Sequence, residues 1–422
     1  MKGLRVFGIS RGGNIMQVKT RSTETFSIVA IIVFLATSGF PSFLIFKGYI
    51  PLLLPFAIYY LVKYNKAKTI NAILSFVFLM GVFALIHYTL GHFTIVGLSA
   101  FILSMMTLFA VSYVIRDQFV STFIKVIKFI SSISLIIWTL VVLFPFLHNI
   151  LTNIGNSLPQ MLSNEWINNT SNPGVSLYIY YLPTSIDTFY TSFIRNCGPF
   201  YEPGLFASYL VLALVFNMIR LQKLFHKENI VFILCLLSTC SSAGYISLIL
   251  IILFSTTYQQ KWYTKVLSYI IIILCLPSVM GLDFMTEKIL VNLESASTSS
   301  SSRFGAVLYH YEKVLESPWV GYAGGELPIT TIDRVLGGGM GNQLSPNGLS
   351  FCFVYWGIPL AFLFYIMLYK GLVKLFDNKF DLYHRIFIYI IVLSTAFSQT
   401  ITIEPIFLLI ALFSITRHHG AY

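Results

Sequence analysis

The sequence predicts an all-α polytopic membrane protein that forms one integral membrane domain over residues 1–422 and crosses the membrane about twelve times. Of its 422 residues, 56% are hydrophobic and only 10% are charged. The mean hydropathy of +0.79 lies above the range of water-soluble proteins of this size. Apolar runs near the length that a helix needs to cross a bilayer recur along the chain. Lipid is therefore the predicted surrounding of most helices.

Ten apolar runs are the candidate spans, and several are too short or too long for one complete crossing. They are Phe26 to Phe46, Tyr49 to Val62, Thr69 to Leu90, Phe93 to Ile115, Phe123 to Leu147, Gly204 to Ile219, Ile230 to Phe254, Val266 to Leu282, Leu349 to Tyr369 and Ile386 to Ile415.

Clusters of Lys and Arg beside these runs predict the orientation, because basic residues near helix ends stay in the cytoplasm. Only six of the 27 basic residues lie outside the clusters: Lys47, Arg195, Lys288, Arg303, Lys313 and Arg334. Both termini are then cytoplasmic. The net charge of +11 is an orientation signal rather than the mark of a nucleic-acid-binding surface.

Some helices must be broken or re-entrant for this orientation to hold. Basic clusters flank residues 229–258 on both sides, so this stretch crosses an even number of times although it is too short for two full spans. We expect the break at Ser238 to Gly244, where hydroxyl side chains can satisfy freed backbone groups. Two other runs are expected to turn back: Ile386 to Ile415 near residues 398–405, and Phe26 to Val62 near Gly39 to Pro41 or Lys47 to Gly48.

Two long segments, residues 148–203 and 283–348, remain on the non-cytoplasmic side and are the predicted site of substrate handling. The second contains apolar residues at near-helical spacing, which predicts a short helix that lies on the membrane surface and ends before Pro318. These apolar residues are Phe304, Val307, Leu308, Val314 and Leu315.

Four ionisable residues in the two loops are the candidates for chemistry. Arg195 is the only basic residue of the first loop, and Glu202 lies at the start of a predicted helix. Local chemistry alone also allows Arg195 to anchor the loop at lipid head groups and Glu202 to complement the helix dipole. Arg303 and His310 are seven residues apart, so they share one face of the short helix. Taken singly, each of these two is typical of a solvated surface residue.

Aromatic residues crowd the first loop, and their rings can stack on sugars. Interfacial belts are rich in Tyr and Trp for a different reason, namely the amphipathic ring, and we expect this role for most of them. They are Trp166, Tyr178, Tyr180, Tyr181, Tyr190 and Tyr201.

The order of several motifs resembles the Wzy-type O-antigen polymerases. Arg195 is followed by Gly198-x-x-x-Glu202-Pro-Gly-x-Phe-Ala, which opens a helix, and the next apolar stretch has a Ser-rich break. The later motifs are Ser302-Arg303, Pro318-x-x-Gly-x-x-Gly324, and Asn347-Gly followed by an apolar run into Gly357-Ile-Pro359. The resemblance covers roughly residues 195–359.

The resemblance implies a GT-C-like membrane glycosyltransferase of the lipid-linked class in the inner membrane of a Gram-negative bacterium. Such an enzyme transfers the growing glycan from undecaprenyl pyrophosphate onto the next lipid-linked repeat unit at the periplasmic face. It uses neither a nucleotide sugar nor a metal or other cofactor. Its implied partners are the lipid-linked donor and acceptor, membrane lipids and a chain-length regulator, a polysaccharide co-polymerase.

The implied residue roles follow from that reaction. Arg195 and Arg303 would bind the pyrophosphate, because guanidinium groups match phosphate oxygens in paired hydrogen bonds. Glu202 and His310 are the two candidates for the base that takes the acceptor proton. Tyr201 and Asn347 are further substrate-binding candidates.

Three alternatives remain open. An O-antigen ligase usually has His-Asn where this sequence has Pro346-Asn347, which disfavours that assignment. Another surface-polysaccharide polymerase would share the motifs. A lipid-linked oligosaccharide flippase or transporter would share the helix count but should place ionisable groups at the middle of the membrane.

Overall fold

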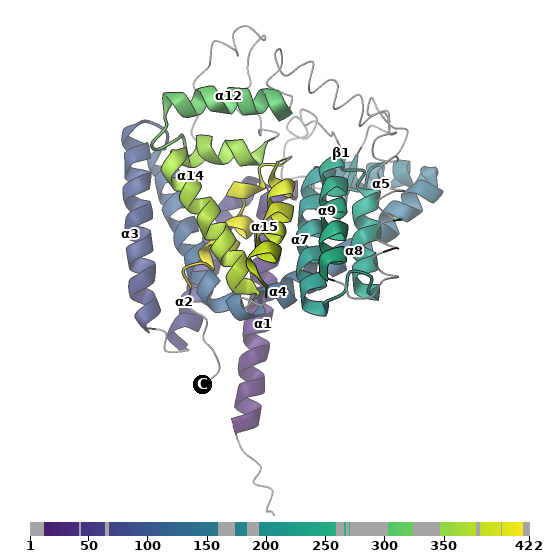
Figure 1. The fold of residues 1–422 in the computed structure, drawn as a ribbon, viewed down its shortest axis with the longest axis horizontal. Coiled ribbons are helices and arrows are strands. Elements are labelled where there is room, and N and C mark those ends of the chain that lie inside the picture. Colours follow the sequence, from purple (N-terminus) through teal and green to yellow (C-terminus); the bar gives the residue numbers. More distant parts are fainter. Residues whose placement is uncertain are drawn as a thin grey trace, which may run out of the picture.

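The structure is a computed structural model that describes residues 12–41, 44–63, 67–158, 174–183, 194–258, 266, 270, 303–323, 347–376, 380–397 and 399–416. These residues form a bundle of helices with one small hairpin (Figure 1). The elements are α1 Gly12–Gly39, η1 Leu44–Leu53, α2 Leu54–Lys63, α3 Ala67–Thr89, α4 Ile95–Leu143, α5 Pro145–Ser157, β1 Gly174–Ser176, β2 Tyr181–Pro183, α7 Pro203–Leu221, α8 Lys227–Ser238, α9 Ser242–Tyr258, α12 Arg303–Glu316, α14 Gly348–Leu375, α15 Leu382–Ala396, η3 Ile401–Ile403 and α16 Pro405–Leu412.

Five of the helices in the described ranges are long and apolar enough to cross a membrane: parts of α1 and α3, and α4, α7 and α14. Shorter apolar helices include α9 and α15. The prediction of an all-α membrane protein is confirmed at this level, whereas the number of crossings stays a prediction. The candidate span Val266 to Leu282 lies outside the described residues except at positions 266 and 270.

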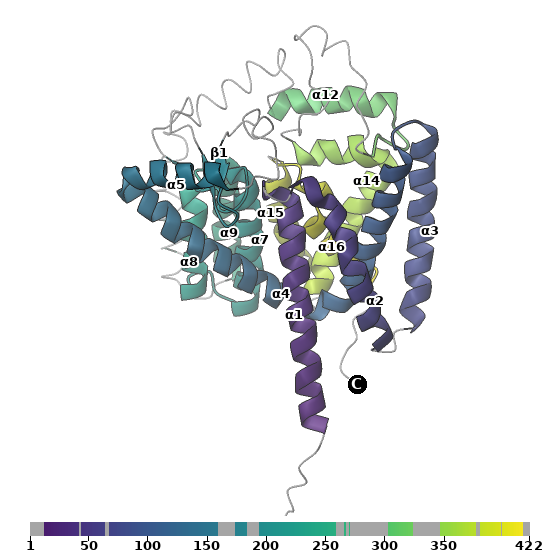
Figure 2. The ribbon, with the colours of Figure 1, turned by 180° about the vertical axis from the view of Figure 1, so that it is seen from behind.

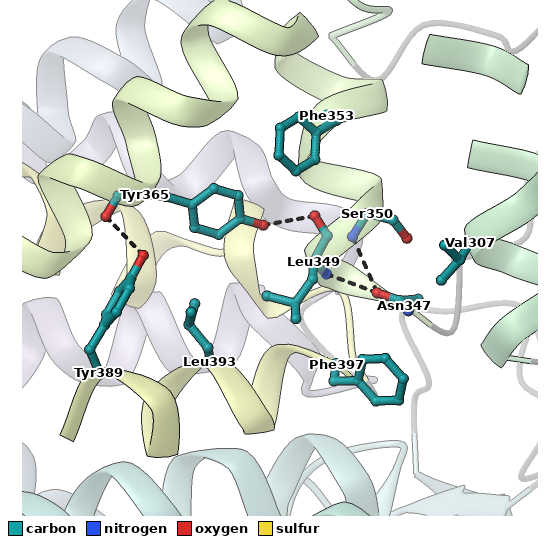
Figure 3. A pocket seen from close by; sticks show the side chains of 9 residues that line it. All are labelled: Val307, Asn347, Leu349, Ser350, Phe353, Tyr365, Tyr389, Leu393 and Phe397. Atoms are coloured by element: carbon teal, nitrogen blue, oxygen red, sulfur yellow. Dashed lines mark hydrogen bonds between the residues drawn. The ribbon is translucent and has the colours of Figure 1, made fainter. Parts of the chain in front are cut away.

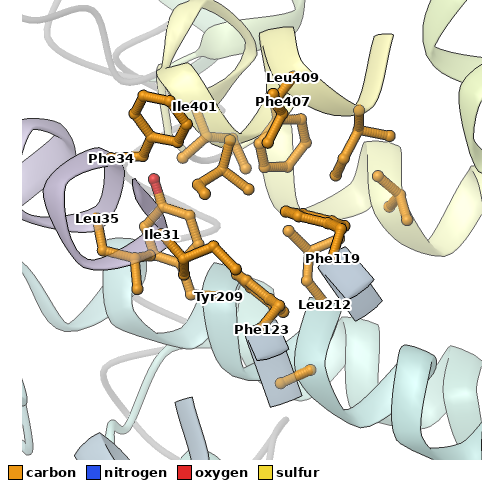
Figure 4. Close-up of a cluster of buried hydrophobic side chains, with 14 of the residues drawn as sticks. Ile31, Phe34, Leu35, Phe119, Phe123, Tyr209, Leu212, Ile401, Phe407 and Leu409 are labelled. Atoms are coloured by element: carbon orange, nitrogen blue, oxygen red, sulfur yellow. The ribbon is translucent and has the colours of Figure 1, made fainter. Parts of the chain in front are cut away.

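Helix α7 is the centre of the bundle. Every residue from Pro203 to Ile219 is buried, because α4, α8, α9 and α15 pack around this helix. Phe119 and Phe123 of α4 and Ile31 of α1 pack with Tyr209 and further buried side chains at this centre (Figure 4). In contrast, α3 lies at the edge and exposes large apolar side chains, which is what a helix facing lipid requires.

The sequence predicts separate spans at Phe93 to Ile115 and Phe123 to Leu147, but the structure does not separate them into two helices. The backbone is helical without a break from Ile95 to Leu143, and α4 takes up both runs. Figure 2 shows α4 descending beside α3 and then rising toward α5. The polar residues between the two runs change the hydropathy of the segment but do not stop the helix.

The two predicted helix breaks are confirmed. Helix α8 ends at Ser238 and α9 begins at Ser242, so the break falls inside the hydroxyl-rich segment. Helices α15 and α16 are likewise joined by the short η3 turn, which ends before Glu404. Of the two turns proposed for residues 26–62, the structure has the first, because α1 ends at Gly39.

Several of the basic clusters meet at one end of the bundle. Lys128 lies 3.7 Å and Arg220 lies 2.8 Å from the carboxylate of Glu228, where α8 begins. Arg116 donates a hydrogen bond of 2.7 Å to the carbonyl of Thr416. The structure therefore brings together basic residues that are far apart in the sequence, as the predicted common cytoplasmic side requires.

At the end of the bundle opposite to these basic residues, α12 lies across the helices and alongside the first turns of α14 (Figures 1 and 2). This confirms the short helix predicted before Pro318. The apolar run from Leu349 to Tyr369 lies within α14, one of the helices long enough to cross a membrane, but α14 is kinked at Gly357, whose φ of 72° and ψ of 169° are not helical. Pro359 follows the kink and cannot donate a backbone hydrogen bond.

The segment after α12 forms backbone hydrogen bonds with the residues on either side of this kink. The amide of Tyr322 donates 2.9 Å to the carbonyl of Val354, and Ala323 does the same to Tyr355. In the other direction, Ile358 donates 2.7 Å to the carbonyl of Pro318. Backbone groups freed by the kink are thus satisfied by a loop that is distant in sequence, which hydrocarbon surroundings demand.

Two glycines allow this close approach. A Cβ at Gly357 would lie 2.6 Å from the carbonyl carbon of Trp319, and a Cβ at Gly321 would lie 2.5 Å from the amide of Gly357. Both glycines have positive φ, which other residues rarely adopt. The two motifs Pro318-x-x-Gly and Gly357-Ile-Pro therefore form one structural unit, the kink joint.

We predict that Gly357→Ala destabilises the protein by about 3 kcal/mol, because the alanine meets both backbone strain and a clash with the Trp319 backbone. Gly81→Ala in α3 is the matched control, since nothing lies within 4 Å of its added methyl group. Thermal unfolding in detergent should show a lower melting temperature for Gly357→Ala alone. Equal melting temperatures for both variants would contradict the proposed role of the kink joint.

Candidate functional site

The segment 194–202 of the first loop is held by Asn196, a fully buried residue. Its side-chain oxygen accepts hydrogen bonds from the hydroxyl of Ser134 and, at 3.0 Å, from the amide of Gly198. Its side-chain nitrogen donates 2.8 Å to the hydroxyl of Ser238. Asn196 thus ties the loop to α4 and to the break between α8 and α9. Sequence analysis did not identify it.

Arg195 lies over that same break. Its Nε donates 3.2 Å to the carbonyl of Thr239, and its Nη2 donates 3.1 Å to the carbonyl of Cys240. A guanidinium group at the C-terminal end of α8 is favourable because that end carries partial negative charge. These bonds use two of the five guanidinium N–H groups, so any role in binding pyrophosphate falls to the others.

Glu202 is half-buried and precedes Pro203 at the start of α7. Its side chain makes no capping hydrogen bond to the helix. Tyr201 beside it is buried and is not part of an aromatic belt facing lipid, and the same holds for Tyr180 and Tyr181. The pKa of Tyr201 is raised well above its usual value by burial and by the nearby carboxylates of Glu202 and Glu404. Two acidic side chains therefore lie near one phenol group.

Glu404 has the same local arrangement as Glu202. It is buried, precedes a proline and starts a helix, in this case α16. The repeated Glu-Pro pattern before an apolar run is visible in the sequence, and Glu404 falls within the turn predicted near residues 398–405.

Three helix starts lie together around Gln399. A Cβ at Gly204 in α7 would lie 2.5 Å from the side-chain nitrogen of Gln399. A Cβ at Gly348 in α14 would overlap the backbone carbonyl oxygen of Gln399. Thr402, just before α16, donates 2.9 Å to the carbonyl of Gly348. We call this region, made of residues 201–204, 347–348 and 399–405, the helix-start junction. Helix N-termini carry partial positive charge, which suits a site that holds an anion next to acidic groups.

Asn347 has a structural role at the junction. It is buried, and its side-chain oxygen accepts hydrogen bonds of 3.1 and 3.2 Å from the amides of Leu349 and Ser350. It is the N-cap of α14, a position that Asn favours. Its substrate-binding role stays a prediction.

His310 is buried, with 1% of its surface exposed, so the expectation of a solvated residue is wrong. Its Nδ1 lies 2.6 Å from the hydroxyl of Ser350 in the first turn of α14. Burial lowers the pKa of His310 to about 4, so the imidazole is neutral at pH 7. The first turn of α14 therefore connects His310 to the helix-start junction. The side chain of Arg303 lies outside the described residues, so its shared face with His310 is not tested.

The helix that carries His310 turns polar residues inward. Lys313 is fully buried, with its Nζ 3.1 Å from a carboxylate oxygen of Glu316, which also accepts 2.9 Å from the hydroxyl of Tyr322. The outer face carries Tyr311, 63% exposed, and Leu315, 60% exposed, together with the exposed carboxylates of Glu312 and Glu316. Lys313 would otherwise be a natural surface control for Arg303, but its burial makes it unsuitable.

Within the described ranges, no three His, Cys, Asp or Glu side chains are grouped so that they could hold a metal ion. Searches of protein-family models, curated proteins and solved structures found no match to this chain.

The buried His310 predicts a pH dependence of stability. Because its folded pKa of about 4 lies below the unfolded value of 6.5, the unfolded state binds more protons between these values, and stability falls as the pH drops through this range. We expect a loss of about 2 kcal/mol from His310 between pH 8 and pH 5. Thermal unfolding at both pH values should show a smaller difference for His310→Asn than for the wild type. An unchanged difference would contradict the burial of a neutral His310.

Proposed function

We propose that this protein is an O-antigen polymerase, a membrane glycosyltransferase that moves the growing glycan from undecaprenyl pyrophosphate onto the next lipid-linked repeat unit. The observation that carries the proposal is that motifs distant in sequence pack together. Glu202-Pro-Gly and Asn347-Gly meet at the helix-start junction, and Pro318-x-x-Gly meets Gly357-Ile-Pro at the kink joint. These are the motifs on which the resemblance to Wzy-type polymerases rests.

The orientation of the site follows from charge. The basic residues that meet near Glu228 and Thr416 mark the cytoplasmic end under the positive-inside rule. Segments 148–203 and 283–348, with the helix-start junction, then face the periplasm of a Gram-negative inner membrane, and both termini are cytoplasmic. A lipid-linked glycan would meet the junction at the level of its pyrophosphate.

The reaction needs a base and a group that stabilises the departing pyrophosphate. The acceptor hydroxyl attacks the anomeric carbon of the donor, the bond from that carbon to pyrophosphate breaks, and the hydroxyl proton passes to the base. Glu202 fits the base better than His310, because His310 is buried against Ser350. Helix N-termini, Arg195 and Arg303 would stabilise the negative charge that develops on the pyrophosphate.

Deletion of the gene separates the proposed function from its alternatives. A strain without the protein should still attach a single repeat unit to lipid A core but lose the long lipopolysaccharide ladder. Absence of the single repeat as well would identify a ligase or a flippase instead. Restoration of the ladder by the wild-type protein then provides the assay for variants.

Glu202→Gln should abolish the ladder at unchanged protein level. A positioned general base contributes roughly 10² to 10⁴ in rate, and an amide cannot accept the proton. Glu312→Gln, which changes an exposed carboxylate on α12, is the matched control and should leave the ladder intact. A full ladder from Glu202→Gln would show that Glu202 is not the base and only complements the helix dipole.

Arg303→Lys should shorten the ladder or remove it, although the charge is kept. Lysine lacks the planar pair of donors that matches a phosphate. Loss of one charge-assisted hydrogen bond, worth about 1.5 to 3 kcal/mol, slows chain growth by about one to two orders of magnitude. Arg303→Ala should be worse, while Lys288→Ala in the same loop should resemble the wild type. A full-length ladder from Arg303→Lys would show that the residue only attracts anions or anchors the loop.

A further inference from the structure

A pocket of about 390 Å³ lies between α12, α14 and α15 (Figure 3). Its walls are almost entirely apolar or aromatic. The lining residues are Val307, Asn347, Leu349, Ser350, Phe353, Tyr365, Tyr389, Leu393 and Phe397. The kink at Gly357 creates part of this space, because it folds α14 back so that Tyr365 reaches Leu349 of the same helix.

The tyrosine hydroxyls in the wall are turned to the backbone. Tyr365 donates 2.7 Å to the carbonyl of Leu349, and Tyr389 donates 3.0 Å to the carbonyl of Tyr365, as the dashed lines in Figure 3 show. With these hydroxyls paired, the aromatic rings form the surface of the pocket. Such walls suit a hydrocarbon chain.

Polar side chains reach the pocket at one end. Asn347 and Ser350 lie there, in and just before the first turn of α14, and Ser350 contacts His310. This end adjoins the helix-start junction through Gly348. A ligand with an apolar chain and an anionic head would therefore find its two parts matched by the two ends of the site.

The rim of the pocket is apolar and is exposed on the surface of the bundle. Val307 and Phe397 are each 36% exposed at its rim, and Ile390 of α15 and Phe362 of α14 are 47% and 57% exposed beside it. A hydrocarbon chain could pass sideways from the bilayer into the pocket without crossing water. A single pocket fits a single-chain lipid better than a phospholipid, which would have to separate its two chains.

We propose that this pocket holds the part of a polyprenyl chain nearest its diphosphate, with the diphosphate at the Asn347–Ser350 end. The inference rests on the proposed function, since it names where a lipid-linked substrate of that reaction binds. It adds a lipid-binding role for α15, which none of the sequence motifs contains.

Photolabelling of the full-length protein in nanodiscs tests the site. The probe is a polyprenyl diphosphate with a diazirine near its diphosphate, and mass spectrometry locates the label. We expect label on Phe353, Leu393 or Phe397, reduced by unlabelled polyprenyl diphosphate but not by phosphatidylglycerol. Equal reduction by phosphatidylglycerol, or no label at these residues, would overturn the proposal.

Leu393→Trp provides the variant, because an indole in the pocket displaces part of the chain. Each methylene kept out weakens binding by about fourfold, so labelling should fall at least roughly tenfold. Leu79→Trp makes the same change on the exposed face of α3, a helix that does not line the pocket, and should label like the wild type. Leu393→Cys, alkylated by an apolar maleimide after folding, repeats the test without a folding risk. Normal labelling of the alkylated protein would overturn the proposal.

Failure of this inference differs from failure of the proposed function. Labelling needs no turnover, whereas the ladder does. A ladder that depends on the protein, together with absent pocket labelling, overturns the pocket and keeps the polymerase. Specific labelling without any effect of the gene on the ladder supports the pocket and overturns the polymerase.

Discussion

At Gly357 the backbone of α14 leaves the helix, and the carbonyls of Val354 and Tyr355 lose their partners within it. In hydrocarbon such groups must be satisfied by protein, since no water is present to replace the lost bonds. Tyr322 and Ala323 supply the donors, and Ile358 returns a hydrogen bond to Pro318. The position of α12, the fold of α14 and the space between them all depend on this exchange.

The same constraint operates at the break between α8 and α9. There the carbonyls of Thr239 and Cys240 accept hydrogen bonds from Arg195, and Ser238 is bonded by Asn196. The residues that complete this broken helix are thus neighbours of Glu202 in sequence. Both segments, residues 194–202 and 318–323, serve as hydrogen-bonding partners for helices that cannot complete their own backbone. Candidate site residues near them, such as Glu202, are consequently held on a rigid frame.

Local signals in the sequence predicted much of the fold. The hydroxyl-rich segment from Ser238 to Gly244 and the polar turn before Pro405 marked real breaks, because serine, threonine and proline act on the backbone where they stand. Uninterrupted helix in α4 was missed, since hydropathy responds to Arg116 and its neighbours whereas helix formation does not. In α4, hydropathy therefore indicates whether residues are polar or apolar, but not whether their backbone is helical.

The site was less predictable because its contacts join distant residues. The burial of His310 depends on Ser350, and Asn196 acts through Ser134 and Ser238, none of which is adjacent in sequence. Glu404 is the exception, since its Glu-Pro start repeats that of Glu202 and could have been noticed. The role of Arg303 stays a prediction, because its side chain lies outside the described residues.

The inward-facing polar side of α12 also bears on the order in which the chain is assembled. During synthesis α12 emerges before α14, the helix against which it later packs. The outer face of α12 carries Tyr311 and Leu315 but also Glu312 and Glu316, so α12 can rest in the membrane interface with the side of Lys313 and His310 in water. Insertion of α14 then covers that side. A packing face of leucines would have been left exposed in the interval and open to aggregation.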